Sequence, residues 1–404
     1  MRDGGSSGSS AGVARGSTAL VGDLERLAAE ASRLPESRRG RWHRAGLSPR
    51  IERRLDIASA AVVLALVVGW VWSIAMAVSG RLPGMGIGST SAAMAASLTS
   101  ADATSAAYLT DATLNALVGG LRGASGKLRA EIVAPGTRVS DSTVGGATLR
   151  VEAPGASGSD VAPRSGIFRL VAALGTALKP VGDFSVIGLV PSSQKQKGKL
   201  GLYYVGSWPG EKGGKVNAPS KAPPDRYQPP SGFIEVTQAN ADTRISEHFR
   251  LRDFLTHDQP NVWPKYLVLQ MRNVDKLELV LSDLQQHGID VSGVKVMSGF
   301  RTPQYNEGGG VTTGRASLSR HMYGDAADIF IDSNHDGVMD DLNHDGKINI
   351  GDSRVIQQAV DRVEAAHPEL VGGAGVYPAE SGHGPFIHID SRGYRARWVG
   401  SGGG

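Results

Sequence analysis

The apolar and polar positions along the chain fall into distinct zones, of which the most uniform is an uncharged apolar run over residues 57–79. A helix of this length is about 35 Å long, enough to cross a hydrocarbon core of about 30 Å. Arg50, Arg53 and Arg54 precede the run closely, whereas only Arg81 follows it closely. By the positive-inside rule, we expect a single-pass membrane helix with the N-terminus in the cytoplasm and the rest of the chain outside it.

Two other interpretations of this run stay open. A buried helix of a soluble core would also be apolar throughout. Ala75-Met76-Ala77 resembles the cleavage site of a secretory signal, although the run begins late for one and is long. Trp70 and Trp72 lie nearer its far end, where interfacial aromatic residues are common, and this favours the membrane helix.

The remaining zones differ in pattern. Short β-like runs such as ATLRVEAP and GIFRLVAAL recur between turn residues in one zone, whereas the last zone mixes a helical apolar periodicity with strands such as VKVMS and FIHID. The pattern predicts a basic cytoplasmic tail over 1–56, an Ala/Ser/Gly-rich stalk over 80–127, a small β-rich domain over 128–207, a Pro/Gly linker over 208–232 and a mixed helix and strand domain over 233–404.

Composition narrows the function classes. The chain has no Cys, which excludes disulfides, thiolate metal sites and Cys nucleophiles, so any metal must be held by His, Asp or Glu. The formal net charge is +4. Residues 1–56 hold 11 Arg against seven acidic residues, so they carry all of this excess. A nucleic-acid-binding body is therefore not expected, because its basic residues would lie on the folded domain.

Candidate chemistry is concentrated near the C-terminus. His321 and Asp328 lie seven residues apart with Gly324 between them, where the backbone can turn, and His388 follows sixty residues later. Two imidazoles and one carboxylate leave a fourth position open on zinc, as catalytic zinc sites require. A His and an Asp at this spacing are by themselves weak support, because most such pairs are structural.

The neighbouring motifs add a family resemblance. SGFRTPQYN, SxHxxGxAxD and a terminal GxGxY, FIHID and RxRW resemble the zinc D-Ala-D-Ala carboxypeptidase and murein endopeptidase family, in particular its periplasmic peptidoglycan endopeptidase branch. The resemblance covers about residues 233–400. It implies a small α+β domain, an antiparallel sheet with flanking helices, and it says nothing about residues 1–230. Combined with the zones predicted from the pattern, it gives an α+β zinc peptidase domain preceded by the β-rich domain, the stalk and the transmembrane helix. The expected orientation of that helix then places the protein in the bacterial cytoplasmic (inner) membrane, with the catalytic domain in the periplasm.

The resemblance implies roles for individual residues. His321, Asp328 and His388 would bind Zn²⁺. Arg301 would contact a carbonyl or carboxylate of the substrate, a task that suits a forked guanidinium, unless it is an ordinary turn arginine. Ser319 would bond backbone or substrate near the metal, and a simple turn serine is an equal alternative.

The general base is a departure from the family pattern. Several relatives place an acidic residue three positions before the last ligand, where this chain has Pro385. His383 and Asp390 are therefore the candidates for polarising water or stabilising an oxyanion, and of these two His383 is slightly preferred. A loop histidine without a catalytic role is the alternative for His383. Glu380 is a third candidate.

An acidic insertion over 332–352 predicts structural Ca²⁺. Its second half places oxygen ligands at positions 1, 3, 5, 7, 9 and 12 with Gly346 at position 6, as an EF-hand loop does, and its Asp at position 12 resembles dockerin loops. A solvated acidic loop is the alternative. The ligands of this second loop are Asp341, Asn343, Asp345, Lys347 (backbone), Asn349 and Asp352. The first loop offers Asp332, Asn334, Asp336 and Asp340, and is incomplete or shares Asn343.

Together these features predict a membrane-anchored zinc peptidase that hydrolyses peptide bonds of peptidoglycan, as a D,D-carboxypeptidase or a cross-link endopeptidase. Two alternatives from other classes stay open. One is a peptidoglycan-binding module without turnover, suggested by Pro385. The other is an interaction protein that uses its dockerin-like loops to recruit a partner in a calcium-dependent way.

Overall fold

The computed structural model describes residues 108–152, 159, 161–162, 164–211, 217–308, 315–380 and 382–400. The expected fold class, an α+β peptidase domain preceded by a β-rich domain, a stalk and a transmembrane helix, is wrong. The described part has mixed helix and strand content with a curled sheet, and none of its helices is both long and apolar enough to cross a bilayer. Its longest helices have 16 and 17 residues. The expected tail over 1–56 and span over 57–79 lie outside the described residues.

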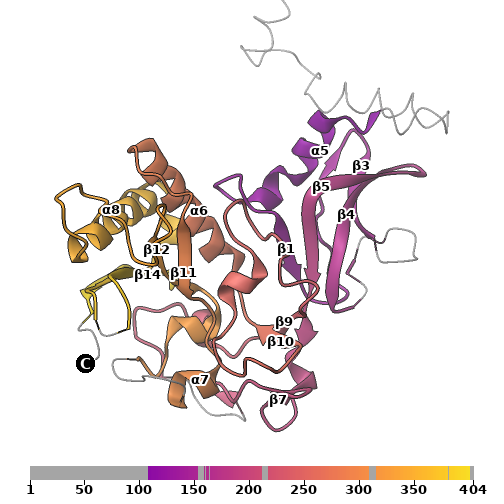
Figure 1. Cartoon of the computed structure of the whole chain (residues 1–404). Coiled ribbons are helices and arrows are strands. Elements are labelled where there is room, and N and C mark those ends of the chain that lie inside the picture. Colours follow the sequence, from indigo (N-terminus) through magenta and orange to yellow (C-terminus); the bar gives the residue numbers. More distant parts are fainter. Residues whose placement is uncertain are drawn as a thin grey trace, which may run out of the picture. The chain divides into compact units, whose positions relative to one another are not determined.

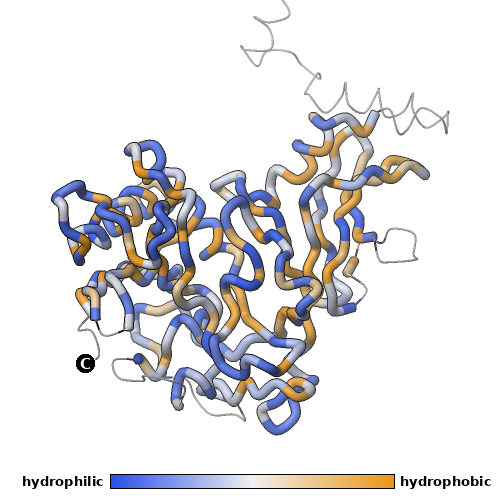
Figure 2. The backbone as a smooth tube through the Cα atoms, in the orientation of Figure 1, coloured by the Kyte–Doolittle hydropathy of each residue, from blue (hydrophilic) through white to orange (hydrophobic). Residues whose placement is uncertain are grey.

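A five-stranded sheet forms the first part of the described chain, in the order β1-β5-β4-β3-β2 (Figure 1). Burial alternates along β3, as it does in a strand with one face on a core. Figure 2 shows many hydrophobic positions along β3, β4 and β5. The strands are β1 (Ala130–Val133), β2 (Thr143–Val144), β3 (Ala147–Glu152), β4 (Gly166–Leu174) and β5 (Ala177–Gly188).

Helix α5 (Asp111–Val118) lies in the last part of the predicted stalk over 80–127. Thr110 caps the helix by accepting a hydrogen bond from the backbone N–H of Thr113. Leu114, Leu117 and Val118 are buried in one core with residues of the sheet. The helix therefore belongs to the fold because its apolar side needs the sheet to exclude water. The 3₁₀ helix η3 (Gly119–Arg122) follows it.

The predicted linker over 208–232 also differs from the structure. Trp208 and Tyr227 are buried, and the indole N–H of Trp208 donates to the carbonyl oxygen of Met322 at 2.9 Å. These aromatic anchors hold a Pro-rich stretch against the core. The short elements here are β6 (Val190–Pro191), η4 (Ser192–Gln194), β7 (Lys199–Leu200), β8 (Tyr203–Tyr204), η6 (Pro224–Tyr227), β9 (Gly232–Val236), η7 (Leu251–Phe254) and β10 (Lys265–Leu267). Strands β10, β9 and β6 form a small sheet in this order.

A second five-stranded sheet, in the order β11-β12-β14-β13-β15, carries the candidate site. All its neighbouring strands are antiparallel except β13 and β15, which are parallel. Helix α8 packs against β13 and β14, and helix α6 packs against α8. The elements are α6 (Met271–Gln286), β11 (Val294–Ser298), α7 (Pro303–Gly308), η8 (Arg320–Tyr323), β12 (Ala326–Ile331), α8 (Ile350–Ala366), η9 (Pro368–Leu370), β13 (Gly373–Tyr377), β14 (Phe386–Asp390) and β15 (Ala396–Val399).

The alternation of side chains along β14 determines which residues face the candidate site. Ile387 and Ile389 are fully buried and point to one side of the sheet, so Phe386, His388 and Asp390 point to the other. One side of the strand thus faces the apolar core, and the other side carries the polar residues His388 and Asp390.

Candidate metal centre

The candidate site is built on one row of residues that runs across the second sheet. Asp328 on β12 pairs in register with Ser298 on β11 and with His388 on β14. Gly375 on β13 pairs in register with His388 and with Trp398 on β15. Residues paired in this way share a face of a sheet, so this row of five positions lies on one face.

The third side chain of the site, that of His321, comes from outside the sheet. His321 lies on η8, immediately before β12, and Gly324 ends this turn with a left-handed backbone (φ 71°). A Cβ at Gly324 would overlap the backbone of Val268, so only glycine fits there. The turn brings His321 over Asp328, as Gly324 was expected to allow.

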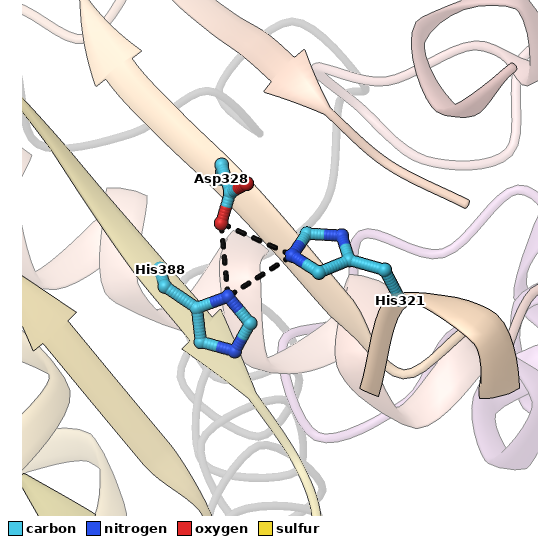
Figure 3. A group of neighbouring side chains, drawn as sticks. All are labelled: His321, Asp328 and His388. Carbon is cyan, nitrogen blue, oxygen red and sulfur yellow. Dashed lines mark hydrogen bonds and ion pairs between the residues drawn. The ribbon is translucent and has the colours of Figure 1, made fainter. Parts of the chain in front are cut away.

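Three ligand atoms converge at one point (Figure 3). Nε2 of His321 lies 3.1 Å from Oδ1 of Asp328 and 3.1 Å from Nδ1 of His388, and the last two atoms are 2.9 Å apart. Donors arranged tetrahedrally around zinc are about 3.3 Å apart, so small shifts would accommodate an ion. All three side chains are buried.

The other nitrogen of each imidazole is already occupied. Nδ1 of His321 donates to the carbonyl oxygen of Gly299 at 2.6 Å. Nε2 of His388 lies 3.0 Å from Oδ2 of Asp390, a carboxylate that accepts this proton. Each ring thus keeps its proton on the outer nitrogen and turns a lone pair toward Asp328, which is the tautomer that a metal ligand needs.

Electrostatics favour the ligand forms of two of the three groups. Burial, followed by the charge of Arg301, lowers the pKa of His321 to about 4, so this imidazole is neutral at neutral pH. Burial by itself raises the pKa of Asp328. The positive charge of Arg301 and the contacts with His321 and His388 outweigh it and hold this pKa well below its usual range. A neutral imidazole and an ionised carboxylate are the forms that bind a metal.

The group of His321, Asp328 and His388 could therefore bind a metal ion. Within the described residues, no other three His, Asp or Glu side chains place ligand atoms within 4.8 Å of one another. Three protein ligands of nitrogen and oxygen suit several divalent ions, zinc among them.

Arg301 lies against a ligand of this group. Its Nη2 donates to Oδ2 of Asp328 at 2.6 Å, and its Nε donates to Oγ of Ser298 at 2.8 Å. The guanidinium thus fixes the oxygen of Asp328 that faces away from the two imidazoles. Ser319 is the N-cap residue of η8 and makes no side-chain capping bond. Contact of Arg301 or Ser319 with a substrate stays a prediction.

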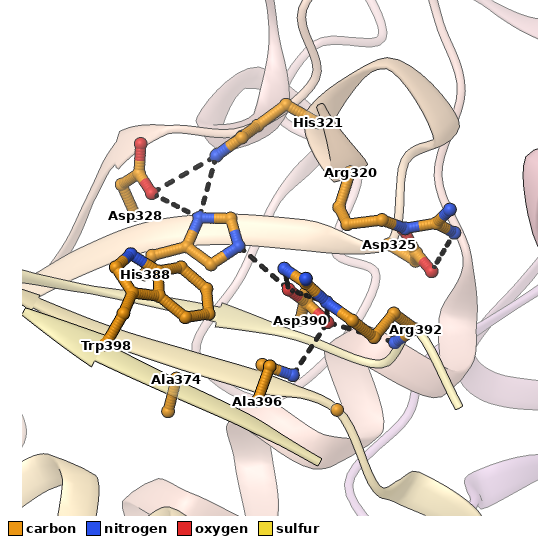
Figure 4. Close-up of polar contacts among 12 residues, drawn as sticks. Arg320, His321, Asp325, Asp328, Ala374, His388, Asp390, Arg392, Ala396 and Trp398 are labelled. Atoms are coloured by element: carbon orange, nitrogen blue, oxygen red, sulfur yellow. Dashed lines mark hydrogen bonds and ion pairs between the residues drawn. The ribbon is translucent and has the colours of Figure 1, made fainter. Parts of the chain in front are cut away.

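The three candidates for the general base have different surroundings. Asp390 is fully buried, and it accepts hydrogen bonds from the backbone N–H of Gly373 at 2.8 Å and from Arg392 (Figure 4). It contacts the outer nitrogen of His388, so it orients a ligand. The ring of His383 packs edge-on against Phe386, with Nδ1 2.8 Å from the carbonyl oxygen of Gly384. Glu380 and His383 exchange two backbone hydrogen bonds in a tight turn.

The acidic insertion folds as two similar loops. Asp332 accepts from the backbone N–H groups of Asp336 and Gly337, and Asp341 accepts in the same way from Asp345 and Gly346. The carboxylates of the two loops do not form a converging group of three.

The last residue of the second loop has a structural role at the start of α8. Asp352 accepts from the backbone N–H groups of Leu342 and Asn349 at 2.9 and 2.8 Å. With Asn349 it forms the capping box of this helix.

Three contributors to the site carried little or no sequence signal. The carbonyl of Gly299 is a backbone group and has no signal of its own. Asp390 was weighed as a base, yet the alternation in FIHID places it on the same face as His388, which is a signal for contact between the two. Arg392 follows the strand and is visible only in three dimensions.

No protein-family model, no curated protein and no solved structure matches this chain. The chemistry of the site therefore rests on its own geometry and on the sequence motifs around it.

Proposed function

We propose that this chain is a zinc-dependent peptidase that hydrolyses peptide bonds of peptidoglycan, as a D,D-carboxypeptidase or a cross-link endopeptidase. The observation that carries the proposal is the buried group of His321, Asp328 and His388, with both imidazoles turned to offer a lone pair to one point. Zinc fits because it accepts two imidazoles and a carboxylate and keeps a fourth position for catalysis. The substrate class rests on the resemblance of the three motifs.

When bound, zinc would supply Lewis-acid activation of an amide carbonyl and of water. The chain's own residues do the rest. Gly299 and Asp390 hold the two imidazoles in the ligand tautomer, and Arg301 holds the carboxylate of Asp328. Arg301 also brings a positive charge to the edge of the site, where it can attract a substrate carboxylate or a developing oxyanion.

His383 is the proposed proton-transfer group. It precedes β14 on the chain, and its ring packs on Phe386, which lies on the same face of β14 as His388. An imidazole there can accept a proton and pass it on. Asp390 is less suited, because its carboxylate is fully buried and already engaged by His388 and Arg392.

For the loops over 332–352 we propose a structural Ca²⁺ site in the second loop. Its oxygen-bearing residues recur at the spacing of an EF-hand loop, and its last residue caps α8, so an ion there would stiffen the start of this helix. The first loop lacks a complete ligand set.

The test of the peptidase proposal is direct. The purified chain, loaded with zinc, is incubated with cross-linked muropeptides and with uncross-linked pentapeptides, and the products are identified by mass. We expect loss of a terminal D-Ala or opening of the cross-link, and neither product with His321→Ala. If the folded, zinc-loaded chain leaves both substrates intact while still binding them, the peptidoglycan-binding alternative replaces the peptidase.

A further inference from the structure

An aromatic group borders the metal centre on the side of β15. We call Tyr377, Phe386 and Trp398 the aromatic shelf. The rings of Tyr377 and Phe386 stack at 4.5 Å with an interplanar angle of 5°, and the indole of Trp398 lies 5.3 Å from the imidazole of His388. Figure 4 shows this indole beside the metal ligand. The shelf is therefore continuous with the centre along the same face of the sheet.

Two glycines make room for the shelf. A Cβ at Gly375 would overlap the indole of Trp398, and a Cβ at Gly400 would overlap the ring of Tyr377. The indole thus lies directly over the backbone of β13 at Gly375, where there is no side chain, and its edge points toward His388 on β14. One face of Trp398 is covered by the sheet, while the residue as a whole stays partly exposed.

The indole is held in place from its edges. Its N–H donates to the hydroxyl of Tyr377 at 3.0 Å, and the guanidinium of Arg392 lies 5.2 Å from its ring centre. Arg392 is itself fixed by Asp390. A partly exposed aromatic ring that is so restrained loses little conformational entropy when a ligand packs on it.

The two ends of the row that carries the metal ligands are unlike each other. At the β11 end, Arg301 offers a positive charge beside Asp328. At the β15 end, Trp398 offers an apolar ring beside His388. A substrate that spans the centre thus meets a cation on one side and an aromatic surface on the other.

We propose that Trp398 is a specificity-determining residue whose indole packs on the small apolar side chain of the residue on the acyl side of the scissile bond. In both proposed peptidoglycan substrates that residue is D-Ala, so the group in contact is its methyl. This inference rests on the proposed function. It assigns the leaving side of the substrate to the Arg301 end and the acyl side to the aromatic shelf.

The test is a double-mutant cycle between protein and substrate. The two substrates that are compared differ in a single residue, which is D-Ala or Gly at the acyl side of the scissile bond. Each is prepared as a diacetyl-Lys tripeptide and as the corresponding cross-linked dimer. In the unaltered protein, loss of the methyl should raise KM about fourfold, the effect of one buried methyl group. In Trp398→Ala this ratio should fall to about one, whereas Trp398→Phe should retain part of it. Trp263→Phe, at an aromatic residue outside the site, is the matched control.

A second measurement does not need turnover. Intermolecular nuclear Overhauser effects between the indole protons and the D-Ala methyl should appear with the unaltered, metal-free protein, so the test survives if Trp398→Ala does not fold. If the protein hydrolyses the substrates with the same D-Ala to Gly ratio in Trp398→Ala, the inference is overturned and the proposed function stands. If hydrolysis is absent but the methyl contacts the indole, the peptidase proposal fails and the inference stands for binding. Absence of both overturns both.

Discussion

Nε2 of His388 lies 3.0 Å from Oδ2 of Asp390, and this contact decides which nitrogen of the imidazole faces the metal position. Asp390 is itself held by the backbone N–H of Gly373 and by Arg392. Because a carboxylate can only accept from the ring, Nε2 carries the proton and Nδ1 is left as the ligand. The two residues lie on one face of β14, separated by a single residue that points into the core.

This relationship gives the first prediction. Asp390→Asn presents an amide to Nε2 and removes a negative charge, so the ligand tautomer of His388 loses its support. Zinc affinity should fall about 10- to 100-fold, as is typical for the loss of such a partner. Competition with a chelator of known affinity measures this fall. Asp361→Asn, at a carboxylate that pairs with Arg395 and Arg397 away from the site, should leave zinc affinity unchanged. Equal affinities for both variants would remove the orienting role of Asp390.

The ligand set gives the second prediction. Replacing His321, Asp328 or His388 with Ala leaves two protein ligands, which rarely hold zinc tightly enough to stay loaded. Bound zinc should fall from about one per chain to near zero, and hydrolysis with it. Metal content and turnover are measured on the same preparations. His257→Ala is the matched control, because this exposed imidazole bonds the carbonyl oxygen of Met297 outside the group. Retention of zinc by any of the three variants would mean that a different residue completes the site.

The third prediction concerns the proton-transfer group. His383→Ala should keep its zinc, because His383 is not part of the converging group. Turnover should fall by about 10²- to 10⁴-fold, as expected for the loss of a general base. Bound zinc and kcat are both measured, for this variant and for Asp390→Asn. Full activity in His383→Ala would transfer the role to another group, with Glu380 the next candidate.

A fourth prediction concerns stability and pH. Burial raises the pKa of Glu131 on β1 from 4.5 to about 7. Its contribution to stability is therefore complete below about pH 4.5 and is lost as the pH rises through about 7, since the folded state holds the proton longer than the unfolded state. Glu131→Gln should raise the free energy of unfolding at pH 8, on the order of 2 kcal/mol after allowance for partial exposure, and change it little at pH 4.5. Urea unfolding at both pH values measures this.

The control for this experiment is Glu307→Gln, at an exposed glutamate on α7. It should show no such pH-dependent gain. A gain at pH 8 no larger for Glu131→Gln than for Glu307→Gln would rule out the burial effect.

Calcium gives the fifth prediction. An ion that binds only the folded state adds roughly 2.7 kcal/mol to its stability at a hundredfold excess over Kd. The melting temperature should therefore rise with millimolar calcium, and Asp345→Ala, in the second loop, should reduce the rise. Asp336→Ala, at the equivalent position of the incomplete first loop, should reduce it less. A melting temperature that does not respond to calcium would remove the proposal.

The sequence by itself determined which residues could bind a metal ion. His321, Asp328 and His388 were identified from residue type, spacing and motif, and the structure brings all three to one point. This was possible because a metal ligand needs one of few side chains, and because FIHID alternates as a strand does. Burial of the apolar positions of α6, and the turn at Gly324, followed in the same way from local pattern.

The prediction of separate zones was less successful, for a physical reason. Local composition suggested a stalk and a linker, yet Leu117 and Trp208 are buried. Small and flexible residues permit an extended chain, but a few well-spaced apolar anchors suffice to hold such a segment on a core.

Only the tertiary structure decided how the ligands are tuned. The contacts of Gly299 with His321, of Asp390 with His388 and of Arg301 with Asp328 join segments far apart in sequence or involve a backbone carbonyl. The row from Ser298 to Trp398 depends on the register of five strands, and register is set by packing and hydrogen bonding between strands. A sequence states which side chains are present, whereas their tautomers, charges and neighbours follow from which strand lies beside which.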